Sequence, residues 1–279
     1  MTIKAVQQFQ LGTVMNNEKQ AENTLRLMKE AGYEGIELCD FMISPTPLAV
    51  KLLTKAAGMP VGNGGKLNWP GLIREAGLQV PSLHMYLNAI EEEPDKKIAE
   101  ARLYGTGYVT VTGMYRFDYS DSAKVHELAQ RLNKAGETLT AQKISLLYHN
   151  HNAEFAKTDT GKVAYEILLE ETDPAYVNFE FDSYWAIDAG VSALGWMQKL
   201  GTRMKLYHVN DRGCRRKGPS MTPILKQDSM ELGTGNLDLE PMIRQALSVN
   251  VDAIILESHK NWIEKSPVRS FQVSAEYLK

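Results

Sequence analysis

Cysteine is scarce in this sequence, and its spacing excludes two common ways of stabilising a small domain. The 279 residues include two cysteines, Cys39 and Cys214, which lie far apart in the chain. Because no CxxC pair occurs, the sequence predicts neither a disulfide framework nor a zinc ribbon.

An excess of one charge and a long apolar run are also missing. The chain has 31 Lys and Arg residues against 34 Asp and Glu residues, a net charge of −3, which gives no general attraction to nucleic acid or to a membrane surface. No apolar run is long enough to cross a bilayer, and the opening residues, MTIKAVQQFQLG, contain no hydrophobic signal core. We therefore expect a cytoplasmic protein that binds neither membrane nor nucleic acid.

The apolar residues, 43% of the chain, fall into short β-rich runs that alternate with helical patterns. Alternation of this kind requires parallel strands, because each return crossover needs a helix. Eight such repeats in this length predict an α/β fold, a (β/α)8 TIM barrel that forms a single domain over residues 1–279. The expected strands cover residues 3–9, 35–40, 78–85, 108–113, 144–151, 176–182, 204–211 and 251–259.

A doubly wound open sheet is the competing architecture for this pattern. Such a fold normally carries a glycine-rich turn after its first strand, and QQFQLGTVMNN has none. The later segment LGTGNLD contains two glycines, Gly233 and Gly235, which we interpret as turn residues. The longest connection, residues 211–236, is expected to be either a functional loop that contacts substrate or a solvated loop.

The ends of the expected strands are unusually polar. In a TIM barrel the active site lies at the C-terminal ends of the strands, and residues two apart on a strand share a face. Inward charged side chains are unfavourable unless they are paired or bound to a metal, so this convergence predicts a divalent metal ion. The polar pairs are His149 and His151, Glu180 and Asp182, His208 and Asn210, and Glu257 and His259, with His84 at the end of the third strand.

Simpler interpretations exist for single members of this set. One inward histidine is more often a hydrogen-bonded core residue than a metal ligand, and Asp182 alone could be a helix N-cap. The sixth histidine, His126, lies in an expected helix and is interpreted as a surface residue. Four polar positions on consecutive strands favour a shared site over four separate structural roles.

Five segments then resemble, in their order along the chain, the sugar isomerase/epimerase superfamily with a xylose isomerase-like TIM barrel. They are YHNHNAEF, FEFDSYWAIDAG, LYHVND, LGTGNLDL and IILESH. This superfamily includes ketose 3-epimerases, inosose dehydratases, dehydroshikimate dehydratases and endonuclease IV. The resemblance is good from the fifth strand to the eighth and loose before it, and it is more specific for the superfamily than for the substrate.

The resemblance implies one divalent ion, with Mn²⁺ preferred over Mg²⁺, Co²⁺ or Zn²⁺. Its ligands carry over directly to Asp182, His208 and Glu257. Relatives often have ENH where this chain has HNH, so His149 stands at the position of a glutamate. Either His149 binds the metal, since imidazole suits the same ions, or Glu154 does. We prefer Glu154, because an oxygen-rich site suits Mn²⁺ and His149 is then available for proton transfer.

The resemblance also implies roles for the remaining polar residues. His149, His151 and Glu257 would remove and return a proton beside a carbonyl, while the metal stabilises an enediolate. Arginines and a lysine of one segment, Arg215, Arg216 and Lys217, could hold a phosphate or carboxylate, or could lie in a solvated loop. Glu180 has a buried ion-pair role as its alternative. The expected substrate contacts are His84, Glu180, Trp185, Arg212 and His259.

These observations predict a metal-dependent isomerase or epimerase of a small-molecule carbohydrate, and a homo-oligomer is compatible with them. A lyase is the alternative, because the same enediolate can expel a β-substituent, as in inosose dehydratases and enzymes that act on 3-keto-glycosides. An endonuclease is disfavoured, since that branch needs three metals and Trp185 stands where it places a histidine. A non-catalytic module is disfavoured because three of the four metal ligands match directly.

Overall fold

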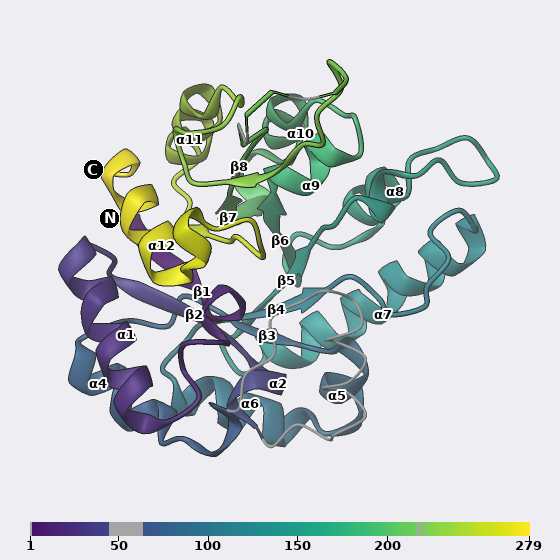
Figure 1. Ribbon diagram of the computed structural model, residues 1–279. Helices are drawn as coiled ribbons and strands as arrows, with labels where there is room; N and C mark the ends of the chain where they lie inside the picture. Colours follow the sequence, from purple (N-terminus) through teal and green to yellow (C-terminus); the bar gives the residue numbers. More distant parts are fainter. Residues whose placement is uncertain (1, 45–63, 216–217, 220) are drawn as a thin grey trace. The chain divides into compact units, whose positions relative to one another are not determined.

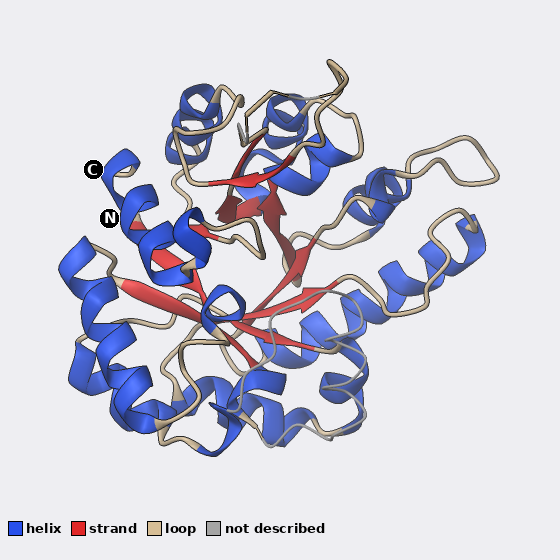
Figure 2. Cartoon of the chain, in the orientation of Figure 1, coloured by secondary structure: helices blue, strands red, loops and turns tan. Residues whose placement is uncertain are grey.

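The computed structural model of the protein describes residues 2–44, 64–215, 218–219 and 221–279. Strands and helices alternate along much of this chain (Figure 1), and loops and turns connect them (Figure 2). The α-helices are Glu18–Ala31 (α1), Asp40–Ile43 (α2), Trp69–Ala76 (α4), Leu87–Glu92 (α5), Pro94–Leu103 (α6), Ser122–Thr140 (α7), Ala164–Glu171 (α8), Ser183–Asp188 (α9), Ala193–Leu200 (α10), Leu239–Ser248 (α11) and Pro267–Tyr277 (α12).

The strands form a closed barrel in the order β1-β10-β7-β6-β5-β4-β3-β2, and the registered pairs within it are parallel. This confirms the predicted (β/α)8 architecture and excludes an open doubly wound sheet. The barrel strands are Ile3–Gln7 (β1), Gly35–Cys39 (β2), Leu83–Met85 (β3), Tyr108–Thr112 (β4), Ser145–His149 (β5), Val177–Asp182 (β6), Met204–Val209 (β7) and Ala253–Leu256 (β10).

The described chain contains two compact units. The first consists mainly of Val80–His208 and Arg244–Ile254, and the second of the described parts of Ile3–Gln79, with Val209–Ile243 and Ile255–Lys279. Among the described residues, none of the helices combines the length and the apolar character needed to cross a membrane. The single domain over residues 1–279 stays a prediction.

In the first unit, side chains alternate between the two faces of β5, β6 and β7, and the register of these strands aligns their polar residues. Phe179 and Phe181 are fully buried, and both contact the ring of Tyr165 on α8. Because successive side chains of a strand point to opposite faces, Glu180 and Asp182 point the other way, away from the helix. Pairing places His149 opposite Glu180 and His208 opposite Asp182. Polar residues of three neighbouring strands therefore come to the same end of the unit.

Strand β5 ends earlier than the sequence predicts, at His149 rather than residue 151. The strand ends here because the side chain of Asn150, instead of the backbone of β5, forms the next hydrogen bonds to β6. The amide of Asn150 donates to the carbonyl of Asp182 at 3.0 Å and accepts from its N–H at 3.0 Å. An asparagine can mimic a backbone unit in this way, so β5 stays attached to β6 while the chain turns away.

The short helix α9, which the sequence analysis did not predict, begins directly after β6. The carboxylate of Asp182 accepts the N–H of Trp185 at 3.1 Å and thereby caps the helix. A capping aspartate satisfies one of the N–H groups that a helix start leaves without an intrahelical partner. The alternative interpretation of Asp182 as an N-cap is therefore correct, and it holds alongside any role in a site.

The second unit contains a hairpin inside the predicted loop 211–236. Strands Asp211–Gly213 (β8) and Asp228–Met230 (β9) pair antiparallel, so the predicted strand 204–211 is interrupted after Val209. The cause is the buried carboxylate of Asp211, which accepts the N–H groups of Gly233 at 3.0 Å, Gly235 at 2.8 Å and Leu237 at 3.2 Å. The LGTGNLD segment is thus a turn folded around a carboxylate.

Replacement of Gly235 tests this turn. A Cβ atom at this position would lie 2.3 Å from Oδ1 of Asp211 and 2.7 Å from the carbonyl oxygen of Arg212. We expect Gly235→Ala to lower the free energy of unfolding by about 1–3 kcal/mol through overpacking. Gly107→Ala is the matched control, because a Cβ there meets no atom within 4 Å. Equal denaturant midpoints for the two variants would contradict this explanation of the turn.

Candidate active site

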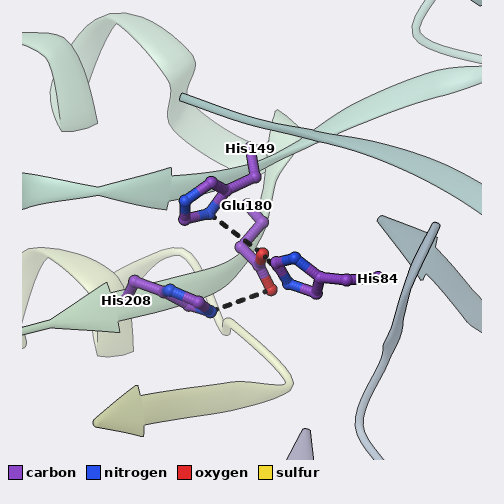
Figure 3. Close-up of side chains that lie close together, drawn as sticks. All are labelled: His84, His149, Glu180 and His208. Carbon is purple, nitrogen blue, oxygen red and sulfur yellow. Dashed lines mark ion pairs between the residues drawn. The ribbon is translucent and has the colours of Figure 1, made fainter. Parts of the chain in front are cut away.

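A single buried carboxylate lies among three histidine rings in the first unit (Figure 3). Oε2 of Glu180 is 2.9 Å from Nε2 of His84 and 3.1 Å from Nδ1 of His149, and its Oε1 is 3.4 Å from Nε2 of His208. The four side chains come from β3, β5, β6 and β7, and none is more than 5% exposed. Glu180 is thus paired with histidines inside the unit, and its role as a substrate contact stays a prediction.

The charge of Glu180 is set by two opposing effects. Burial alone would raise the pKa of its carboxyl group, but the charges of His208 and His84, and hydrogen bonds from His149 and His208, lower that pKa well below its ordinary value. A buried carboxylate is tolerated only when neighbouring groups compensate it. Glu180 is therefore an ionised group paired with the rings around it.

The rings that Glu180 holds also face a second convergence. His149, Asp182 and His208 each offer one potential ligand atom, and these atoms lie within 4.8 Å of one another. Nε2 of His208 faces Glu180, while its Nδ1 lies 3.9 Å from Oδ2 of Asp182. Nδ1 of a neutral His208 would be able to ligate a cation together with the carboxylate of Asp182, and a carboxylate behind a ligating histidine is typical of metal sites.

Glu154 lies in a different environment. Its Oε1 accepts the hydroxyl of Tyr148 at 3.0 Å, and its Oε2 accepts the backbone N–H of His151 at 3.0 Å. The hydroxyl of Tyr119 is 2.7 Å from that of Tyr148, and burial keeps the pKa of both phenols well above the ordinary range. Glu154 is absent from the groups of converging ligand atoms found among the described residues, whereas His149 is present.

Gly113 makes room for this arrangement. A Cβ atom at Gly113 would lie 2.7 Å from Oε1 of Glu154 and 3.1 Å from Nδ1 of His151. The sequence analysis missed the contribution of Gly113, Tyr119 and Tyr148. The hydroxyl groups of the two tyrosines are the only indication in the sequence, because a buried phenol needs a hydrogen-bond partner. The sequence does not reveal which residue that partner is.

His151 and Trp185 lie together beside His149. The ring centroids of His149 and His151 are 5.1 Å apart at 78°, and those of His151 and Trp185 are 5.6 Å apart. His151 is partly exposed, in contrast to the buried His149. The backbone bond to Glu154 therefore fixes the position of this partly exposed histidine.

In the second unit, Glu257 and His259 form a pair directly after β10. Nε2 of His259 is 2.7 Å from Oε1 of Glu257, and the edge of the Phe9 ring packs against the imidazole with centroids 5.4 Å apart. The N–H of Glu257 donates to the carbonyl of Val209 at 3.3 Å. Val209 is the residue that follows His208, a candidate ligand, in the chain.

The arginines expected to hold an anion are mostly engaged within the second unit. Nε of Arg212 donates to Oε1 of Gln227 at 3.2 Å across the β8–β9 hairpin. Arg215 forms an ion pair with the buried Glu231 and donates to the carbonyl of Asn261. The other two basic residues of the predicted anion site, Arg216 and Lys217, lie outside the described residues.

Comparison with known proteins gives a consistent result. A family model described as a xylose isomerase-like TIM barrel matches residues 25–279. An inosose dehydratase of Mesomycoplasma hyopneumoniae is 25% identical over 172 residues, which cover 58% of this chain and 56% of that protein. The chain thus spans little more than half the length of such curated relatives.

Solved structures similar to this one have the same fold. A sugar phosphate isomerase/epimerase from Parabacteroides distasonis superposes with a TM-score of 0.78 at 20% identity, covering 100% of this chain and 94% of that one. A protein named IolI, solved with a bound zinc atom, superposes with a TM-score of 0.68 at 13% identity, covering 99% and 96%. At these identities the similarity shows the fold alone.

The packing around Glu154 can be tested by removing one hydroxyl. We expect Tyr148→Phe to lower the free energy of unfolding by about 1–3 kcal/mol, because a buried carboxyl oxygen loses its donor. The matched control is Tyr165→Phe, since the buried hydroxyl of Tyr165 has no hydrogen-bond partner among the described residues and its removal should be close to neutral. Chemical denaturation measures both, and an equal loss in the two variants would contradict this role for Tyr148.

Proposed function

The chain belongs to the xylose isomerase-like TIM barrel family, and from this premise we propose that it is a divalent-metal-dependent enzyme acting on a small carbohydrate. The reaction begins with removal of a proton beside the carbonyl of a keto-sugar or a related cyclic ketone. The observation that carries the proposal is the convergence of His149, Asp182 and His208, with Glu180 behind two of them.

The donor set fits a divalent cation. His149, Asp182 and His208 supply two imidazoles and a carboxylate, and we propose Glu257 as the fourth ligand because its backbone is bonded to Val209. Two nitrogen and two oxygen donors suit ions of intermediate softness, such as Zn²⁺, Co²⁺ or Mn²⁺. The zinc atom in the IolI structure is compatible with this choice. The preference for Mn²⁺ over Zn²⁺ assumed an oxygen-rich ligand set with Glu154, and a set with two imidazoles removes that reason.

In this proposal His149 replaces Glu154 in the ligand set. Both carboxylate oxygens of Glu154 accept hydrogen bonds from neighbouring groups of the protein, and among the described residues its oxygens do not converge with the candidate ligand atoms, whereas a ring nitrogen of His149 does. His149 is instead held by Glu180 through Nδ1, which leaves its Nε2 as the nitrogen with a lone pair. Glu154 then acts as a positioning residue for His151.

A bound divalent ion would act as a Lewis acid on the carbonyl and adjacent hydroxyl and would stabilise the enediolate. Glu257 is the proposed base, since its carboxylate is buried and paired with His259 at 2.7 Å. His259 is partly exposed and can pass the proton onward. His151, Trp185 and Arg212 are proposed to contact the substrate, with His151 also able to donate a proton.

One observation makes elimination a second candidate reaction. Epimerisation at a single carbon needs a proton acceptor on one face of the substrate and a donor on the other. The strand 5 position, where relatives have a second carboxylate, holds His149, and its ring is engaged with Glu180. Elimination needs one carboxylate base and one proton donor: Glu257 takes the C–H proton, a C=C bond forms, and the C–O bond breaks as the β-oxygen takes a proton from His151. We therefore propose a lyase alongside the isomerase that the sequence predicts, since His151 would also be the second proton-transfer group of an epimerase.

Metal content separates the two candidate ligands of strand 5. We expect purified His149→Ala, Asp182→Ala and Glu257→Ala variants to lose most of the bound divalent metal, because each removes a ligand. Glu154→Ala should keep its metal and lose stability instead. Elemental analysis after dialysis measures this, with Asp95→Ala, an exposed residue of α6, as the control. Loss of metal in Glu154→Ala but not in His149→Ala would contradict the proposed ligand set.

Product analysis separates the two reactions. The enzyme would be incubated in D₂O with an inosose and with a methyl 3-keto-glucoside, and the products followed by nuclear magnetic resonance. Elimination predicts an unsaturated ketone and loss of the β-substituent. Recovery of an epimer or of an isomeric ketone, with deuterium at the reacting carbon and no loss of the substituent, would show an isomerase instead.

A further inference from the structure

The second unit contains a cavity that the proposed reaction does not use. Its volume is about 1090 Å³, and it lies against the segment that follows the β8 strand. Pockets that enclose a drug-sized ligand have volumes of about 300–1,000 Å³, so this space is large for one sugar ring. Among its described lining residues are Arg215, Met221, Pro223, Leu225, Asp228 and Asn261.

Internal bonds define the polar part of the cavity wall. Nη2 and Nε of Arg215 donate to the carbonyl of Asn261 at 2.8 and 3.0 Å, and the guanidinium is paired with Glu231. Nδ2 of Asn261 donates to the carbonyl of Ser229 at 2.8 Å. Because the charge of the guanidinium is already neutralised by a buried carboxylate, the cavity is expected to bind a phosphate weakly. Asp228, which also lines the cavity, is a further acid and is itself paired with Lys260 at 3.4 Å.

The remaining wall is apolar and exposed. Pro219, Met221, Pro223 and Leu225 all line the cavity, and Met221 and Leu225 are 101% and 51% exposed. Lys226 also lines it, but this residue is exposed, so its ammonium group can remain hydrated while the stem contacts a ligand. Neighbouring apolar side chains left in water mark a surface that a ligand covers. The chemistry of this wall therefore suits an uncharged apolar group.

The cavity is built against the segment that carries the proposed base. Asn261 follows His259 by two residues, and the hydroxyl of Ser258 lies 2.9 Å from that of Ser229, next to the lining residue Asp228. Glu257 and His259 thus belong to the same chain segment as the lining residue Asn261, inside the same unit. A molecule whose reacting sugar contacts Glu257 could extend directly into this space.

We propose that the cavity is a subsite for an apolar group joined to the sugar, so that the substrate is a glycoside with an aromatic or aliphatic aglycone. This inference rests on the proposed function for the position of the sugar ring. The apolar lining, the neutralised arginine and the volume define the class of the appended group. A free monosaccharide would leave most of the cavity unfilled.

The chain contains its own reporter of this subsite. Cys214 lines the cavity and is partly accessible, whereas Cys39 is buried and serves as an internal reference. The rate of alkylation of Cys214 by iodoacetamide would be measured by mass spectrometry with p-nitrophenyl α- and β-glucopyranosides, which lack the reactive ketone and so bind without turnover. We expect saturating aryl glycoside of one anomer to slow alkylation by about tenfold, since such pockets bury most of a ligand's surface.

Methyl glucosides and free glucose should leave the rate unchanged. Leu225→Glu, which places a carboxylate in the apolar wall, should weaken binding of the aryl glycoside by about tenfold. Leu103→Glu is the control, because Leu103 is similarly exposed, at 62%, on α6 outside the cavity. Equal protection by methyl and aryl glycosides, no protection by either, or unchanged affinity in Leu225→Glu would overturn the subsite.

The binding assay is independent of the metal and of catalysis. Protection of Cys214 by the aryl glycoside in a protein that binds no metal would uphold the subsite and reject the proposed function. Metal binding and turnover of a free keto-sugar, without protection of Cys214, would uphold the function and reject the subsite.

Discussion

The buried carboxylate of Glu180 is the interaction on which the candidate site depends. Its side chain is fully buried and lies within 3.4 Å of nitrogens from His84, His149 and His208, so each ring has one nitrogen directed at the same centre. Removing such a carboxylate from water is unfavourable unless neighbouring groups compensate it. The histidines supply that compensation. In metal proteins a carboxylate behind a ligating histidine fixes the orientation of its ring.

A consequence is the division of labour within YHNHNAEF. His149 ends β5 and faces Glu180, while Asn150 replaces a backbone unit beside Asp182. The chain then turns, and Glu154 returns to bind Tyr148 and the backbone of His151. Each polar residue of the segment thus has a separate partner, and this separation underlies both the proposed ligand set and the proposal of a reaction that needs one carboxylate base.

Much of this arrangement was predictable, and the remainder has clear physical reasons for being hidden. The alternation of strand and helix patterns predicts the barrel and places polar residues at the ends of its strands. The two-residue period of a strand predicts that Glu180 and Asp182 point in the same direction. The competition between His149 and Glu154 depends on where a side chain five residues along the loop finds its donors, which no local pattern encodes. The β8–β9 hairpin was missed because Asp211 folds the turn from a distance of more than twenty residues. The short helix α9 was missed because Asp182 was considered as an N-cap only as the alternative to a role in the site, although it has the capping role in any case.

The central claim is that two imidazoles, from His149 and His208, bind one divalent ion. X-ray absorption at the metal edge tests it most directly, because multiple scattering from imidazole rings gives the number of histidine ligands in the metal-loaded protein. The account predicts two histidines in the wild type and one in His149→Ala reloaded at high metal concentration. One histidine in the wild type, unchanged in His149→Ala, would contradict it and would return Glu154 to the ligand set.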